Sequence, residues 1–494
     1  MIRNGKKKAI SCALVAAMSV GLAACGTTSY DFKVSYDGIK TGDVSSKVSV
    51  HDPSILKADG EYYIFGSHMS AAKSSDLLNW EKVADGYSKK NPVYGQIYDV
   101  ADEAFAYSGS KNSLIKTDDK QVHVWAPDVI YNETTGLYYM YYCTTSTWNA
   151  SNLCYGTSTT PEGPYEWQGA LIYSGFNRKT ISGTDVLDYV DEDYAYKNYI
   201  KGAQYNYEDY PNAIDPTVFY DADGRMWMVY GSWSGGIFLL EIDKTTGLVI
   251  HPEADKANNV DPYYGKRLLG GGHISIEGPY IMYDETSGYY YLFVSYGALT
   301  SNGGYQVRVF RSKTVDGEYV DMNGKYPEKS AQHQNFGLKL TGNYKLPSLE
   351  KAYMATGHNS AFVDDDGRMY LVYHTRFNDN GEGHSPRVHQ MLVNEDGWPC
   401  ELPYQTQGET VNKDGYDTDD IIGRYYVINQ GTAIDSKIAN PVILYLEKNG
   451  KVKGEKSEGT WECKDGSYYM NITIDGKKSV SYTHLRAHET LSDL

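Results

Sequence analysis

The stretch His51-Asp52-Pro53-Ser54, followed after a short apolar segment by the aromatic run Tyr62-Tyr63-Ile64-Phe65, decides the fold. An Asp-Gly turn separates the two, which predicts a strand, a tight hairpin and a second strand. The same order of signature, turn and aromatic run recurs four more times along the chain. The later signatures are Trp125-Ala126-Pro127-Asp128, Ile214-Asp215-Pro216-Thr217, Ile276-Glu277-Gly278-Pro279 and Gly357-His358-Asn359-Ser360.

A hairpin that recurs and cannot bury its own apolar face is typical of a propeller blade. We therefore predict an all-β fold, with a five-bladed β-propeller over residues 49–404. Successive signatures lie roughly 60 to 90 residues apart, which exceeds the ~40 to 45 residues of a WD40 blade. The extra residues predict long loops on one rim, where a binding cleft is commonly built.

The pattern changes after the propeller. Residues 405–479 contain short strand-like runs and predict a separate small C-terminal β domain, similar to a β-barrel. Residues 480–494 break this rhythm and resemble read-through of a sequencing adapter. We expect this tail to be non-native, in which case the small domain lacks its closing strands.

The first 25 residues predict a lipoprotein signal peptide. A basic start precedes an apolar stretch over residues 9–22, which is too short to span a bilayer. The segment ends in Leu22-Ala23-Ala24-Cys25, which resembles a bacterial lipobox. We expect a lipid anchor on Cys25, a polar tether over residues 26–48, and an extracellular or cell-surface protein; a plain cleaved signal peptide is the alternative.

The amino-acid composition restricts the classes of ligand that the chain can bind. The 46 Lys and Arg against 63 Asp and Glu give a formal charge of -17, which disfavours nucleic acid and polyanionic ligands. The 48 Tyr suit a neutral polysaccharide, because amphipathic rings match the faces and hydroxyl edges of sugars. We expect a monomer that meets the membrane only through its anchor. Cys143 and Cys154 are predicted to be either a disulfide or two buried thiols.

Three of the five signatures carry a carboxylate: Asp52, Asp215 and Glu277. We place them at equivalent positions of the repeat, in extended backbone before a strand, so that they converge on one pocket at the propeller axis. Like charges in one pocket push pKa values apart, leaving one group protonated and another ionised. That division suits the acid and base of glycosidic bond cleavage. The alternative is that each signature is only a turn-forming motif.

These residues resemble glycoside hydrolase family 43, whose members are five-bladed propeller hydrolases of arabinan and xylan. The resemblance implies that Asp52 is the general base, Glu277 the general acid, and Asp215 the residue that orients the acid. It also implies inversion at the anomeric carbon, with the two carboxyls roughly 6.5 to 9.5 Å apart. The motifs that carry it are His51-Asp52-Pro53-Ser54, Ser75-Asp76-Leu77-Leu78-Asn79-Trp80, Trp125-Ala126-Pro127-Asp128, Asn212-Ala213-Ile214-Asp215-Pro216 and Ile276-Glu277-Gly278-Pro279.

Two further segments narrow the resemblance. Gly231-Ser232-Trp233-Ser234-Gly235-Gly236-Ile237 and His374-Thr375-Arg376-Phe377 look like those of extracellular endo-α-1,5-L-arabinanases with a C-terminal β domain. We expect the chain to cut internal bonds of arabinan, a neutral plant cell-wall polysaccharide. Two alternatives stay open: an exo-acting α-L-arabinofuranosidase or β-xylosidase, and a non-catalytic glycan-binding propeller. An insertion over residues 176–210 leaves endo against exo action open.

The resemblance also suggests supporting residues. It implies that Trp125 stacks on a sugar, with packing between blades as the alternative, and that Asn212, Ser232 and Trp233 face the pocket. Related arabinanases hold a calcium ion near the axis through one imidazole and several waters. We expect His358 to be this ligand, with His374 in reserve, although Ca²⁺ generally prefers oxygen.

Overall fold

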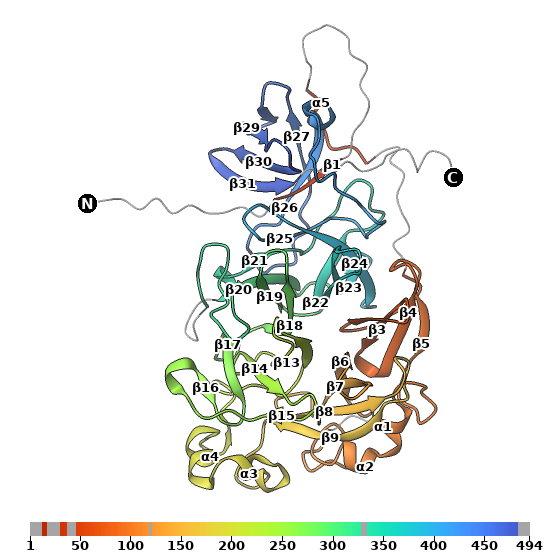
Figure 1. Ribbon diagram of the computed structural model, residues 1–494, viewed down its shortest axis with the longest axis vertical. Helices are drawn as coiled ribbons and strands as arrows, with labels where there is room; N and C mark the ends of the chain where they lie inside the picture. The colour runs from red at the N-terminus through yellow and green to blue at the C-terminus, as the bar shows by residue number, and fades with distance from the viewer. Residues whose placement is uncertain (1–11, 17–29, 37–45, 118–120, 328–332, 483–494) are drawn as a thin grey trace, which may run out of the picture.

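The computed structural model describes residues 12–16, 30–36, 46–117, 121–327 and 333–482 of the chain. Five antiparallel sheets form a ring, and a separate seven-stranded sheet lies at one end of the molecule (Figure 1). We call the five sheets blades I to V in chain order. The predicted all-β architecture, a five-bladed propeller followed by a small β domain, is confirmed.

The first two blades each contain four consecutive strands. Blade I consists of β2 (Ser54–Ala58), β3 (Glu61–Gly66), β4 (Ser70–Ser74) and β5 (Glu81–Ala84). Blade II consists of β6 (Val124–Asn132), β7 (Leu137–Thr145), β8 (Ser151–Ser158) and β9 (Glu166–Tyr173).

Blade III is wider than the others and contains β12 (Thr217–Tyr220), β13 (Met226–Tyr230), β14 (Ile237–Ile242), β15 (Val249–Ile250), β16 (Val260–Asp261) and β17 (Gly265–Leu269). Blade IV contains β18 (Ile276–Asp284), β19 (Tyr289–Tyr296), β20 (Gln306–Ser312) and β21 (Leu338–Lys339). Blade V contains β22 (Tyr353–Val363), β23 (Met369–Phe377), β24 (Ser385–Val393) and β25 (Pro399–Glu401).

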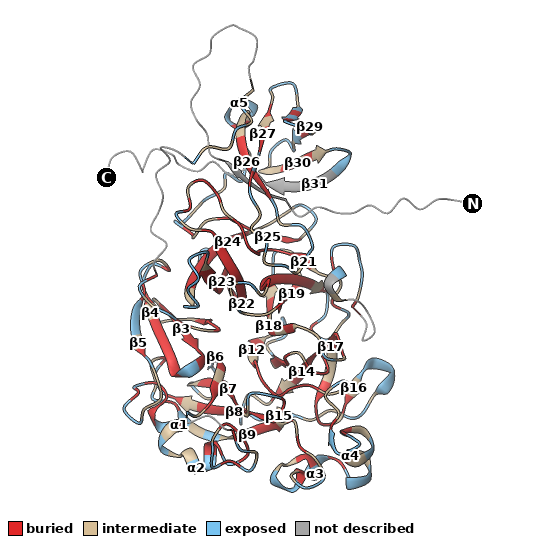
Figure 2. Ribbon diagram, turned by 180° about the vertical axis from the view of Figure 1, so that it is seen from behind, coloured by how far each residue is buried: buried red, intermediate tan, exposed pale blue. Residues whose placement is uncertain are grey.

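The first strands of the blades surround the axis. β2, β6, β12, β18 and β22 each contact the next, and β22 contacts β2, so the ring is closed. Closure is apolar: Val50, Ile55 and Ile64 of the blade I region pack with Tyr370 and Val372 of blade V. Buried residues run along the blade strands in the view from behind (Figure 2). Aromatic and β-branched runs therefore form the walls between blades, as their alternation predicts.

A left-handed residue interrupts each signature at the same position. The residues are Asp52, Ala126, Asp215, Gly278 and His358, with φ of 55°, 41°, 55°, 56° and 49°. The β6–β7, β18–β19 and β22–β23 ladders shift register across this position. We call it the signature bulge. The expectation of extended backbone at Asp52 and Asp215 is wrong, because a bulge turns the side chain out of the strand's alternation.

The small domain consists of β26 (Gly423–Asn429), β27 (Val442–Leu446), β28 (Lys451–Gly454), β29 (Glu458–Cys463), β30 (Tyr469–Ile474) and β31 (Lys477–Tyr482). Strand β1 (Cys12–Ala16), inside the predicted signal peptide, pairs with β26. The predicted anchor Cys25 and most of the predicted tail lie outside the described residues. The buried Arg308 of blade IV fastens the domain, because its guanidinium donates to the Thr432 carbonyl.

The described helices are short. They comprise α1 (Gly95–Asp99), α2 (Ala101–Ala104), α3 (Val186–Tyr189), α4 (Glu192–Asn198) and α5 (Thr418–Ile421), with 3₁₀ turns η1 (Ser67–Met69), η2 (Ile181–Gly183), η3 (Lys256–Asn258) and η4 (His333–Asn335). The 176–210 insertion holds η2, α3, α4 and a hairpin of β10 (Ile200–Lys201) and β11 (Gln204–Tyr205). Within the described part of the chain, none of these helices has the length and apolarity that a bilayer crossing requires.

Cys143 and Cys154 are free and buried. Cys143 lies opposite Leu153, whereas Cys154 lies opposite Tyr142, on adjacent antiparallel strands. Paired residues share a face and successive residues alternate, so the two thiols point to opposite sides of blade II. They also belong to different apolar clusters. Of the two predicted states, the structure therefore has buried thiols.

Candidate active site

Asp52 lies on the signature bulge of blade I, buried beside the axis. Its Oδ1 lies 2.9 Å from His358 Nδ1 and 3.1 Å from His51 Nε2, and its Oδ2 accepts a hydrogen bond from the Ser67 hydroxyl. Burial alone would raise the pKa of Asp52, but the charge of His358, followed by the effect of the neighbouring His51, holds it well below the usual range. Asp52 is therefore an ionised carboxylate, as a general base must be.

His358 occupies the signature bulge of blade V, the position that Asp52 has in blade I. Burial disfavours its charged form, but Asp52, Asp215 and Glu277 together raise the pKa of His358 to about 9. The ring is consequently an imidazolium at neutral pH. A positive charge among three acids offsets their mutual repulsion, and the ring fixes the direction of the Asp52 carboxylate.

Glu277 lies one residue before the signature bulge of blade IV. Trp233 Nε1 donates to its Oε2 at 2.6 Å, Ser232 Oγ donates to the same oxygen at 3.3 Å, and Tyr305 Oη donates to Oε1 at 2.7 Å. Burial raises the pKa of Glu277 and the Asp52 charge adds to this, against the lowering effects of His358, Tyr305 and Trp233. A carboxyl with a raised pKa can retain the proton that a general acid must deliver.

Asp215 occupies the signature bulge of blade III. Its Oδ2 accepts a hydrogen bond of 3.1 Å from the Gly278 amide, the residue that follows Glu277. Burial raises its pKa, and the charges of Glu277 and Asp52 raise it further, whereas His358 opposes them. Asp215 thus contacts the backbone that carries Glu277, a position from which it can orient the acid.

The three predicted carboxylates converge, although not in the way the repeat suggested. Asp52 and Asp215 share the signature bulge, whereas Glu277 precedes it and Gly278 takes its place. The prediction that all three occupy equivalent repeat positions is therefore wrong for Glu277. A chain of contacts joins Asp52 to Glu277: it runs from Asp52 to His358, from His358 Nδ1 to Tyr305 Oη at 3.5 Å, and from Tyr305 to Glu277.

Only some of the predicted substrate-binding residues contact the carboxylate cluster. Ser232 and Trp233 contact Glu277 directly, as described above. Trp125 is half-buried against the blade II and III core, and its indole N–H has no hydrogen-bond partner among the described residues. Asn212 is buried and its amide is used within the protein, because Nδ2 donates to the Trp148 carbonyl at 2.9 Å and Oδ1 accepts from Ser174 Oγ at 3.3 Å.

The predicted calcium ligand His358 fits that role poorly, since its Nδ1 faces Asp52 and a protonated ring offers no lone pair. His374 fits better. Its ring is fully buried, its Nε2 has no hydrogen-bond partner among the described residues, and burial followed by the neighbouring His51 holds its pKa well below the usual range. Ligand atoms of His51, His374 and His384 all lie within 4.8 Å of one another.

Two residues of the site were not predicted from the sequence. Tyr305 follows Gly303-Gly304 in the loop before β20, and Ser67 follows β3. Neither belongs to a signature, so no repeated pattern marked them. A fourth carboxylate, Asp128, is buried and accepts hydrogen bonds from Ser54 Oγ of blade I and from the Val218 amide of blade III. Burial raises the pKa of Asp128 to about 7, and its contacts join three blades rather than enter the site.

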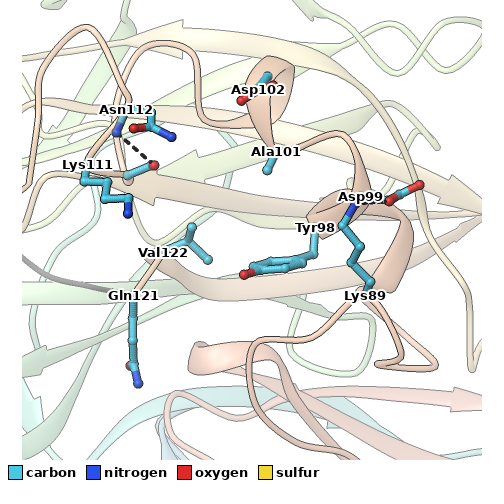
Figure 3. A pocket seen from close by; sticks show the side chains of 10 residues that line it. Lys89, Tyr98, Asp99, Ala101, Asp102, Lys111, Asn112, Gln121 and Val122 are labelled. Atoms are coloured by element: carbon cyan, nitrogen blue, oxygen red, sulfur yellow. Dashed lines mark hydrogen bonds and ion pairs between the residues drawn. The ribbon is translucent and has the colours of Figure 1, made fainter.

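The hollow at the axis is narrow. It has a volume of about 10 Å³ and is lined by Asp52, Asp215, His358 and Asn359, among others, which is room for roughly a single water. A wider hollow of about 410 Å³ lies between α1, α2, residues 110–112 and residues 121–122 (Figure 3). Its lining includes Lys89, Asp99 and Asp102, and none of the predicted site residues belongs to it. The wider hollow is therefore separate from the carboxylate cluster.

An ionised carboxylate and a protonatable one, close together at a propeller axis, are the groups that a glycoside hydrolase requires. A family model described as "Glycosyl hydrolases family 43" matches residues 44–209 and 191–399. A second, described as "C-terminal lipocalin-like domain", matches residues 403–491.

Similar proteins agree with these matches. An "Extracellular endo-alpha-(1->5)-L-arabinanase" of Thermotoga petrophila is 39% identical, covering 88% of this chain and 86% of its own length. An "Extracellular endo-alpha-(1->5)-L-arabinanase 2" of Bacillus subtilis is 37% identical, covering 88% and 87%. A crystal structure of the family 43 YxiA protein from Bacillus licheniformis has a TM-score of 0.76 at 37% identity, covering 89% of this chain and 92% of that one. The chain belongs to glycosyl hydrolase family 43.

Proposed function

We propose that this chain is an inverting endo-arabinanase that hydrolyses internal α-1,5-linked L-arabinofuranosyl bonds of arabinan. The observation that carries the proposal is the electrostatic contrast within one cluster. Asp52 has a pKa held well below the usual range and Glu277 a raised one, and His358 and Tyr305 connect them. The two extracellular relatives are named as endo-arabinanases, which supports this choice of substrate.

Hydrolysis requires that one proton is removed from the attacking water and that another is donated to the leaving oxygen. Asp52 removes a proton from a water on the far side of the anomeric carbon, and the water oxygen bonds to that carbon. The glycosidic bond breaks as Glu277 donates its proton to the leaving oxygen. Attack opposite the leaving group inverts the anomeric configuration. His358 stabilises Asp52 as the anion, and Asp215 holds the Gly278 amide and thereby the Glu277 backbone.

The decisive experiment is a product profile on debranched linear arabinan. An endo-acting enzyme lowers viscosity early, with few new reducing ends and mainly oligosaccharide products. Release of monomer from the start would instead favour an exo-acting α-L-arabinofuranosidase, and release from p-nitrophenyl xyloside a β-xylosidase. Binding of arabinan with no hydrolysis would favour a glycan-binding propeller. Proton NMR of the first products reads the anomeric configuration, and retention would contradict the assigned roles.

A calcium ion remains part of the proposal, with His374 rather than His358 as its protein ligand. When bound, the ion would supply positive charge beside the acids and favour ionised carboxylate. Its remaining ligands would be water, because Ca²⁺ prefers oxygen. Calcium titration by calorimetry tests this directly: wild-type protein should bind one ion after chelation, and the His374→Ala variant should not.

Secretion and anchoring complete the proposal. The relatives are named extracellular, and a lipid on Cys25 would keep this chain at the cell surface as a monomer. Metabolic labelling with a palmitate analogue should mark the wild-type protein and not the Cys25→Ser variant. Soluble release of an unlabelled wild-type protein would instead indicate a plain signal peptide.

A further inference from the structure

Four aromatic rings lie in contact on the rim beside Glu277. We call Trp233, His273, Tyr207 and Trp148 the aromatic strip. The centroid distances are 5.5 Å from Trp233 to His273, 5.2 Å from His273 to Trp148, 5.7 Å from Tyr207 to His273 and 5.8 Å from Trp148 to Tyr207. The residues come from four separate loops, so their meeting is a property of the fold and not of local sequence.

The inner end of the strip reaches the proposed acid. Trp233 Nε1 donates to Glu277 Oε2 at 2.6 Å, while its ring is tilted against His273. The outer end is open to solvent, since Trp148 is 55% exposed. An indole ring buries a large apolar area in most proteins, so a half-exposed tryptophan that packs on an exposed histidine and a partly exposed tyrosine indicates a binding surface.

Backbone and side-chain contacts hold the strip in place. The Asn212 amide donates to the Trp148 carbonyl at 2.9 Å. The Gly272 amide donates to the Glu208 carbonyl at 2.7 Å, which ties the loop of His273 to the insertion that carries Tyr207. Rings that are exposed yet fixed lose little conformational entropy on binding a ligand.

We infer that the aromatic strip binds arabinofuranose residues of the substrate on the leaving-group side of the cut. The inference rests on the proposed function. Sugar rings present apolar faces that pack on aromatic side chains, and the strip carries no acidic group that would select a charged ligand. The leaving-group side follows from the contact with Glu277, because that carboxyl protonates the leaving oxygen. By contrast, Asp52 contacts His51, Ser67, His358 and His374.

The inference also gives the 176–210 insertion a role. Tyr207 lies in this segment, at the edge of the rim, and it packs on Trp148 and His273. The insertion therefore extends a surface for a continuing chain on the leaving-group side. An enzyme that cuts within a polymer needs such a surface, because its substrate extends beyond the cleaved bond on the leaving-group side.

The test compares Trp148→Ala on two substrates. On debranched arabinan, whose chain covers the strip, we expect kcat/KM to fall about tenfold, in line with loss of an aromatic stacking contact. On a nitrophenyl arabinotrioside, whose leaving group is a small aryl ring, we expect a change of less than about twofold. Trp148→Phe should retain most of the activity on arabinan. Tyr131→Ala, which removes an exposed ring at the far end of β6, is the matched control and should change neither rate.

Binding provides a second measurement. In an Asp52→Asn background, which leaves the strip intact, Trp148→Ala should weaken arabinohexaose affinity about tenfold by calorimetry. Equal loss on both substrates, or no loss on arabinan, would overturn the inference. If Trp148→Ala fails to fold, Tyr207→Ala serves the same comparison with the same two outcomes. Failure of the wild-type protein to cut arabinan would overturn the proposed function instead, so the two failures are distinguishable.

Discussion

The two sides of the carboxylate cluster are built from different chemistry. Asp52 is surrounded by imidazoles, with His358 and His51 within 3.1 Å of its Oδ1. Glu277 is surrounded by neutral donors, namely Trp233, Tyr305 and Ser232. A full positive charge favours an ionised carboxylate much more strongly than a neutral hydrogen bond does. Both groups are shielded from water by the same ring of blades, so the difference in pKa direction arises from their partners.

The difference between the two carboxyls indicates how one repeated signature can give Asp52 and Glu277 different surroundings. The signature bulge places Asp52 and His358 in neighbouring blades at the same position, where they form an ion pair. Glu277 stands one residue earlier and faces the loop that carries Trp233. A shift of one residue relative to a bulge changes which neighbours a side chain meets. The proposed acid and base are thus distinguished by register and by the charge of their neighbours.

The largest effect is expected when Asp52 and Glu277, whose surroundings differ, are each replaced by the neutral amide. Asp52→Asn and Glu277→Gln should each lower kcat on arabinan by about 10³-fold, because each removes a general catalyst. On a nitrophenyl arabinotrioside, whose leaving group needs little protonation, Glu277→Gln should recover much of the rate and Asp52→Asn should not. Initial rates on both substrates measure this. Recovery by Asp52→Asn instead would reverse the assigned roles.

Replacing His358 with Gln should have the next largest effect. The variant loses the charge that pairs with Asp52, and kcat should fall on the order of 10- to 100-fold, as for other charged hydrogen bonds. The His358 charge lowers the pKa of Asp52, Asp215 and Glu277 alike. Loss of this charge raises all three pKa values, so both limbs of the pH profile of kcat/KM should move to higher pH.

A pH profile that keeps its position while kcat falls would mean that His358 acts only by packing. His51→Gln is a useful control, because burial lowers the pKa of His51 to about 4 and the ring is neutral at working pH. This control should move the acidic limb much less than His358→Gln does.

Much of the fold was predictable from sequence, because strand periodicity and turn residues repeat five times. The carboxylates were predictable for the same reason, since Asp52 and Asp215 stand in repeated Asp-Pro signatures. The bulge was not, because an Asp-Pro pair favours extended backbone locally and only the packed ring imposes a φ of 55°. Tyr305 and Trp148 were missed because they lie in single-copy loops, whose positions depend on tertiary contacts rather than on pattern.

Tyr305→Phe tests the acid side of the contrast. The Tyr305 hydroxyl donates to Glu277 and lowers its pKa. Without it the pKa of Glu277 rises, so the basic limb of the pH profile, where the acid loses its proton, should move to higher pH. The rate at neutral pH should fall about threefold to tenfold, since a neutral hydrogen bond contributes modestly. An unchanged basic limb would show that Tyr305 does not tune the acid.

Gly278→Ala should produce the smallest effect and the most local one. A Cβ at this position would lie 3.2 Å from the His358 ring, and the φ of 56° strains any side chain. The matched control is Gly224→Ala, which has a φ of 73° but no atom within 4 Å of the new Cβ. Both variants should lose about 1 kcal/mol of unfolding free energy from backbone strain. Only Gly278→Ala should also lower kcat, by about twofold to fivefold, because it displaces the imidazolium that orients Asp52. Equal kcat for the two variants would mean that the His358 ring tolerates displacement, and the base would then owe its low pKa to charge alone rather than to a fixed geometry.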